Sequence, residues 1–195
     1  MSRELVEQLI NAESAEAFLR AQAVASTWET VSALKTEVDR LIGSDLNAAQ
    51  RLSERVDQLA AALGDPVSKG FAEASRARVL HHAGSYAEAD SLYESAIRAT
   101  RAARLTTDTA VIQMHRVFAL TQMGRYDEAL ALARASRRVL SKRSPIHLAQ
   151  LETNVGILYY RLDRYSKAIE HYERARELLA TEGDETMRAV VDTNL

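Results

Sequence analysis

Gly84-Ser85-Tyr86-Ala87-Glu88-Ala89 returns twice further along the chain, as Gly124-Arg125-Tyr126-Asp127-Glu128-Ala129 and as Asp163-Arg164-Tyr165-Ser166-Lys167-Ala168. The copies begin 40 and then 39 residues apart. Repetition at a fixed interval of this size is typical of small supersecondary units that stack on one another. The sequence therefore predicts a repeat protein before any single residue is interpreted.

Each copy carries the signals of a tight turn between two helices. Gly84 and Gly124 suit the left-handed conformation that often ends a helix. Ser85 and Glu88 have the spacing of a capping box for the helix that follows. Apolar and small residues then continue at helical spacing, as in Ala89, Leu92, Tyr93, Ala96 and Ile97. This spacing predicts pairs of antiparallel helices.

The stretch 66–182 resembles tetratricopeptide repeats, in which small residues, Tyr, Ala and a second aromatic residue recur at these relative positions. The helices before the turn align too: Ala77 and Leu80 correspond to Val117 and Leu120, and to Gly156 and Tyr159. Two features depart from the family. The interval is 39–40 residues, against about 34 in the usual repeat. Arg101, Ser141 and Ala180 stand where the family commonly has a closing proline.

The resemblance implies an all-α fold, a right-handed α-solenoid of antiparallel helix pairs. It also implies a concave face, lined by the first helix of each pair, that binds peptides or proteins. The function expected from it is that of a non-catalytic interaction scaffold, not an enzyme.

The expected organisation follows the repeat interval. The expected segments are capping helices in 1–25, a degenerate repeat in 26–64, clear repeats in 65–105, 106–143 and 144–182, and the first helix of a truncated further repeat in 183–195. The expected helix pairs of the clear repeats are 66–82 with 86–104, 107–122 with 126–141, and 145–161 with 165–181. Ser26 with Glu29 predicts a capping box, and Asp65 before Pro66 predicts a helix start.

The end of the sequence repeats the start of an earlier helix. Val191-Asp192-Thr193-Asn194-Leu195 lies 40 residues after Leu151-Glu152-Thr153-Asn154-Val155. We expect the chain to be the N-terminal piece of a longer protein, and we expect its last helix to leave an apolar face that promotes self-association. The layout is similar to bacterial tetratricopeptide proteins that end in a caspase-like CHAT peptidase domain. The alternative function is therefore a regulatory arm of a larger enzyme.

Composition and charge limit the classes of partner, chemistry and location that the sequence allows. The net charge is −2, but residues 1–97 hold 9 basic and 15 acidic side chains, a net charge of −6, and residues 98–195 hold 16 and 12, a net charge of +4. This polarity favours an acidic partner near the later repeats. Cysteine is absent, which excludes disulfides and thiolate chemistry. No apolar run approaches the length of about 18 residues that marks a membrane span. We expect a cytoplasmic protein that needs no cofactor and contacts no membrane.

Alignment of the repeats predicts the residues that line the groove. They are Ser75, Arg78 and His82 in the first clear repeat, His115, Phe118 and Gln122 in the second, and Asn154, Ile157 and Arg161 in the third. Amides suit a peptide backbone, and Arg78 or Arg161 suits an acidic or C-terminal group. The lysines of the family's carboxylate clamp are missing, so no such clamp is expected. The alternative is that these residues are merely solvated, or that the protein fills its own groove.

Other clusters support no chemistry of their own. His81, His82 and His115 lack the partners and spacing of a metal site, and no nucleophile can be paired with them. Residues 134–143 hold five cations and no acid. Because aromatic residues are not interleaved with these cations, a solvated helix face is favoured over a nucleic-acid site.

Overall fold

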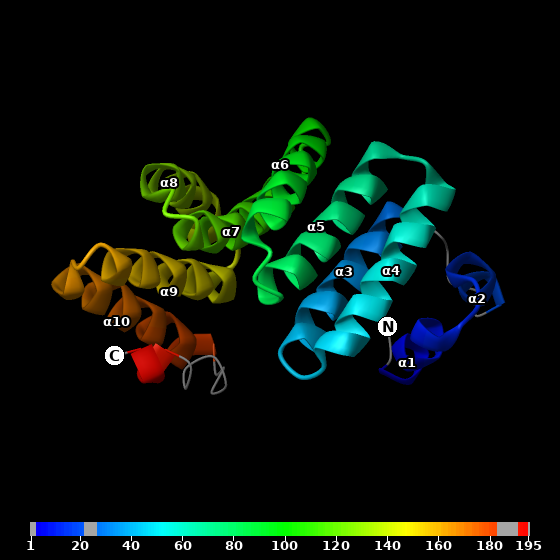
Figure 1. Ribbon diagram of the computed structural model, residues 1–195, viewed down its shortest axis with the longest axis horizontal. Helices are drawn as coiled ribbons and strands as arrows, with labels where there is room; N and C mark the ends of the chain where they lie inside the picture. The colour runs from blue at the N-terminus through cyan, green and yellow to red at the C-terminus, as the bar shows by residue number, and fades with distance from the viewer. Residues whose placement is uncertain (1–2, 22–26, 183–190, 195) are drawn as a thin grey trace. The chain divides into compact units, whose positions relative to one another are not determined.

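The computed structural model describes residues 3–21, 27–182 and 191–194, and every element in it is an α-helix (Figure 1). No strand occurs in these three ranges, so the expected all-α fold of helix pairs is confirmed. The chain divides into two compact units, unit 1 (Met1–Arg104) and unit 2 (Leu105–Leu195). Each unit is described by itself.

Unit 1 consists of two short helices followed by two long pairs. Its helices are α1 (Arg3–Asn11), α2 (Ala15–Ala21), α3 (Trp28–Ile42), α4 (Leu46–Leu63), α5 (Pro66–His82) and α6 (Tyr86–Ala102). The pairs are α3 with α4 and α5 with α6, and α5 also packs against α3 and α4. Trp28 of α3 stacks on Phe71 of α5 with 6.1 Å between ring centroids. The short helices α1 and α2 pack against α4.

Unit 2 repeats the pairing. Its helices are α7 (Thr106–Gln122), α8 (Tyr126–Arg143), α9 (Pro145–Arg161) and α10 (Tyr165–Glu182). α9 packs against both α7 and α8, and α10 packs against α9 without extensive contact with α7 or α8 (Figure 1). Met114, Leu140 and Leu151 are fully buried in the core that α7, α8 and α9 share. Successive pairs therefore stack, whereas a closed bundle would return α10 to α7.

The repeated turn has the same backbone geometry in all three copies. Gly84 and Gly124 have φ values of 82° and 74°, and Asp163 takes their place with a φ of 56°. The amide after each of them donates to the carbonyl five residues earlier, at 2.9 Å in every copy. This hydrogen bond belongs to the Schellman motif, which satisfies a carbonyl that the helix end leaves open. The expected left-handed glycines are confirmed, and Asp is among the few other residues that tolerate this conformation.

The predicted helix caps are right in part. Asp65 caps α5 by accepting from the amides of Val67 and Ser68, both at 2.9 Å. The Ser85–Glu88 capping box is wrong, because the Ser85 side chain makes no cap hydrogen bond. Ser85 instead has φ −82° and ψ 61°, and the Tyr86 amide donates to the Gly84 carbonyl at 3.0 Å. This is an inverse γ-turn rather than the extended conformation of a capping serine.

The cap of α3 also differs from the prediction. Ser26 lies outside the described residues, and Thr27 caps the helix, with its hydroxyl accepting from the amide of Thr30. The capping residue is thus one position later than the predicted box requires.

The predicted last helix falls largely outside the described residues, which omit 183–190 and Leu195. Residues 191–194 are helical, and Val191 is fully buried beside Ala168, Tyr172 and Leu179 of α10. At Val191, α9 and α10 therefore cover the apolar side chain. Self-association through this segment stays a prediction.

Candidate binding surfaces on the first helices

Side chains of one first helix form hydrogen bonds to side chains or backbone of the neighbouring first helix at the repeat interval. In unit 1, Arg78 Nε of α5 donates to Asp39 Oδ1 of α3 at 2.8 Å across 39 residues. In unit 2, Asn154 Nδ2 donates to the Met114 carbonyl at 3.1 Å across 40 residues. Arg161 Nη2 donates to Gln122 Oε1 at 2.6 Å across 39 residues. Residues predicted to bind a ligand thus also join one helix pair to the next.

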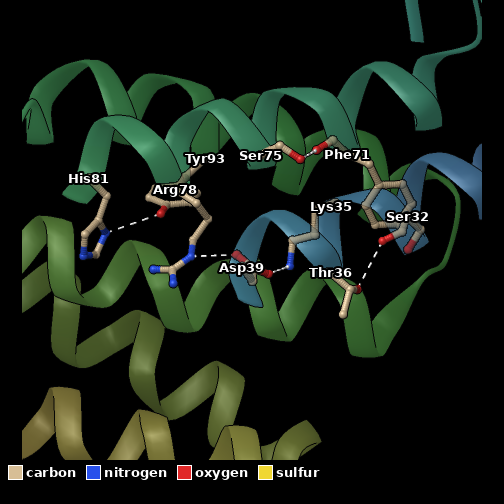
Figure 2. A network of polar contacts seen from close by, with 9 residues as sticks. All are labelled: Ser32, Lys35, Thr36, Asp39, Phe71, Ser75, Arg78, His81 and Tyr93. Carbon is tan, nitrogen blue, oxygen red and sulfur yellow. Dashed lines mark hydrogen bonds and ion pairs between the residues drawn. The ribbon is translucent and has the colours of Figure 1, made fainter. Parts of the chain in front are cut away.

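Asp39 is the centre of a largely buried charge cluster in unit 1 (Figure 2). Its second oxygen, Oδ2, lies 2.6 Å from Lys35 Nζ, and the side chains of Lys35, Asp39 and Arg78 are 8%, 22% and 13% exposed. Burial alone would raise the pKa of Asp39, but Lys35 and Arg78 together hold it below its ordinary value. The carboxylate therefore stays charged and compensates both cations. With two cations and one carboxylate, the cluster carries a net positive charge.

The histidines beside this cluster are neutral. Burial, with a further contribution from Arg78, lowers the pKa of His81 to about 3. His82 is partly exposed, and the partial desolvation of its ring together with Arg78 lowers its pKa to about 4. Their rings stack with 5.1 Å between centroids. The Tyr93 hydroxyl lies 3.4 Å from His81 Nδ1 (Figure 2). Across the described ranges, no group of three His, Asp or Glu side chains is arranged to hold a metal ion.

The nine predicted groove residues differ in accessibility. Ser75 is fully buried, and its hydroxyl donates to the Phe71 carbonyl at 3.0 Å, so it does not line a surface. His115 is buried as well, whereas His82 is exposed. In unit 2, Arg161 is exposed, and Phe118, Gln122, Asn154 and Ile157 are half-buried. The accessible part of the predicted site therefore lies mainly on α7 and α9.

A second charge cluster in unit 2 was missed by the sequence reasoning. Arg137 of α8 donates two hydrogen bonds, of 2.7 and 2.9 Å, to the carboxylate of Glu152 of α9. His171 Nδ1 of α10 lies 2.6 Å from Glu152 Oε2. Burial would raise the pKa of Glu152, but its bonds to His171 and Arg137 hold it below the ordinary value. Tyr159 stacks on the His171 ring with 5.3 Å between centroids. The cluster ties three helices together.

We expect Glu152→Gln to lower the free energy of unfolding of the whole chain by about 2 kcal/mol at pH 7. The neutral amide weakens the contacts that the buried carboxylate makes with Arg137 and His171. A carboxylate whose folded pKa is depressed stabilises the fold above its unfolded pKa, and that contribution disappears as the pH falls through the folded pKa. The difference between variant and wild type should therefore shrink below about pH 4. Urea unfolding at several pH values measures it. Glu173→Gln on the exposed side of α10 is the control, and an equal loss there would contradict the account.

Stacked antiparallel helix pairs with a left-handed turn inside each pair define a helical-repeat protein. The family model described as "Tetratricopeptide repeat" matches residues 108–181, a segment that begins in α7 and ends in α10. Residues 108–181 are therefore similar to tetratricopeptide repeats, and the repeat interval in the sequence is 39–40 residues. No curated protein matches the chain, and the similarity to CHAT-linked proteins stays a prediction.

Tetratricopeptide repeats generally serve protein–protein interaction. None of the helices in the described residues is both long enough and apolar enough to cross a membrane.

Proposed function

We propose that this protein is a non-catalytic interaction module that binds a peptide or protein partner on the surface formed by α7 and α9. The observation that carries the proposal is the exposed Arg161, held across the two helices by its 2.6 Å bond to Gln122. A single hydrogen bond to Gln122 leaves guanidinium N–H groups that can donate to a carboxylate. Because Gln122 already fixes the side chain, a ligand loses less entropy in ordering it.

The neighbouring positions supply the rest of a peptide site. Phe118 and Gln122 on α7, and Asn154, Ile157 and Arg161 on α9, recur at helical spacings of three, four or seven residues. Such spacing places them on one side of each helix. Half-buried apolar side chains beside an amide and a guanidinium suit an extended segment that carries both apolar and acidic residues.

We also propose boundaries for the repeats. We assign one repeat each to 65–105, 106–143 and 144–182, a degenerate repeat to 26–64 and a cap to 1–25. In unit 1, His82 and Arg78 occupy the corresponding positions of α5, and they offer a second, separate surface. Arg78 is mostly engaged by Asp39, so we place the main site in unit 2.

Arg161→Ala tests the proposal. Peptides selected from a random displayed library on the wild-type chain should bind the variant about tenfold more weakly, because one charge-assisted hydrogen bond contributes roughly 1.5–3 kcal/mol. Arg174→Ala, which removes an exposed arginine from α10, is the matched control and should leave the affinity unchanged. Fluorescence anisotropy gives the affinities. Equal binding by all three proteins would refute the assignment to α7 and α9.

A further inference from the structure

Unit 1 contains a cavity of about 530 Å³ between α4, α5 and α6. Its volume falls in the range of small-ligand sites, about 300–1,000 Å³. On α5 it is lined by Lys69, Ala72, Glu73 and Arg76, which share one side of the helix at spacings of three and four residues. At 100° per residue this side faces away from Arg78. The cavity therefore lies on the opposite side of α5 from the surface that carries Arg78.

The cavity has an apolar lining suited to an aliphatic chain. Ala60 of α4 and Ala72 of α5 are buried and line it, and the half-buried Leu92 lines it from α6. Methyl and methylene groups of this kind favour a hydrocarbon stem by removing its surface from water. They do not provide a partner for a polar ligand end.

Two carboxylates at the wall lack full compensation. Glu73 is only 15% exposed, and its nearest cation in the described residues, Lys69 Nζ, is 3.9 Å away. Asp57 lies 3.4 Å from Arg76 Nε, which is longer than a charge-assisted hydrogen bond of about 2.7–2.9 Å. Burial, reinforced by Glu73 and Glu54 and opposed by Arg76, raises the pKa of Asp57 to about 6. A further positive charge would stabilise both ionised carboxylates.

We propose that this cavity binds an alkylammonium group, with its stem on Ala60, Ala72 and Leu92 and its charge beside Asp57 and Glu73. Lys69 and Arg76 are 74% and 54% exposed, so their side chains are able to turn into solvent as the ligand enters. The net charge of −6 over residues 1–97 favours the approach of a cation. The source is either a lysine side chain of a protein partner or a free diamine.

Titration of the full chain, followed by NMR of its backbone amides at low salt, tests the proposal. The probes are N-acetyl-lysine methylamide, 1,4-diaminobutane and the uncharged N-acetyl-norleucine methylamide. We expect saturable shifts confined to α4, α5 and α6 with an ammonium probe and none with norleucine. Binding of the lysine probe indicates a protein side chain as the source, and binding of the diamine alone indicates a free amine.

Glu73→Gln should weaken the binding of the ammonium probe about tenfold, because the charged partner is lost. Glu94→Gln on the exposed side of α6 is the matched control and should bind as the wild type does. Asp57→Asn provides a second variant in case Glu73→Gln is poorly folded, and the same weakening is expected. Equal binding of norleucine, no saturable shift with either amine, or unchanged affinity in the folded variant would overturn the proposal.

Discussion

Asp39→Asn is expected to lower the free energy of unfolding by about 3 kcal/mol at pH 7, because it leaves two largely buried cations without their counter-charge. Lys35 Nζ and Arg78 Nε lie 2.6 and 2.8 Å from the two oxygens of this carboxylate. Asn preserves the size of the side chain, so the loss reports charge rather than packing. Urea denaturation followed by circular dichroism measures it.

Two further variants separate this effect from a general sensitivity of α3. Glu37→Gln removes an acid from the same helix, where its partner Arg40 is 47% exposed, and it should cost less than about 0.5 kcal/mol. Adding Lys35→Met to Asp39→Asn removes one stranded cation and should recover part of the stability. If Asp39→Asn costs no more than Glu37→Gln, the cluster does not join α3 to α5 as described.

Gly156→Ala is the second substitution with a large expected effect. At an open helical site this change would stabilise the helix by up to about 1 kcal/mol. Here a Cβ at Gly156 would lie 2.4 Å from the Tyr172 ring of α10, and Tyr172 is buried. Overpacking of this kind costs about 1–3 kcal/mol, and the close approach to the ring favours the upper end, so we expect a net loss of up to about 2 kcal/mol. Thermal unfolding of the two proteins measures the difference.

Gly43→Ala is the matched control for Gly156→Ala. Gly43 ends α3 with a φ of −74°, and a Cβ there would meet nothing closer than the Arg40 carbonyl at 3.8 Å. Its substitution should therefore be neutral or slightly stabilising. Shortening the ring by Tyr172→Leu in the Gly156→Ala background should restore part of the lost stability. A stabilising Gly156→Ala would show that α9 and α10 are not in close contact at this point.

The helices were predictable because their signals are local and recur three times. The expected 66–82, 145–161 and 165–181 correspond to Pro66–His82, Pro145–Arg161 and Tyr165–Glu182. The left-handed turn followed from glycine alone at Gly84 and Gly124. The Ser85 cap was not predictable, because the backbone conformation at this turn decides whether a serine hydroxyl can reach an amide.

The candidate site was predictable only in outline. The repeat interval placed Asn154, Gln122 and Arg161 on first helices, but alignment does not show which of these side chains bond to one another. Asp39 lies in α3, where no clear copy of the repeated turn marks the sequence, and it was missed although its distance of 39 residues from Arg78 equals the repeat interval. Ser75 aligned with the groove, yet it donates to its own helix and is buried, because hydroxyls readily bond to a carbonyl four residues earlier.

The central claim, that helix pairs stack instead of closing into a bundle, is tested most directly by two spin-label distances in unit 2. The sequence holds no cysteine, so spin labels that react with cysteine attach only at the two positions where cysteines are introduced. One pair of labels, at Gln122→Cys and Arg161→Cys, measures the distance from α7 to α9. The other pair, at Gln122→Cys and Lys167→Cys, measures the distance from α7 to α10. If the pairs stack, the first distance is the shorter one, at about the usual interhelix spacing of 10 Å plus the label lengths. In a closed four-helix bundle α10, not α9, lies beside α7. A shorter distance from Gln122 to Lys167 than to Arg161 would contradict the account.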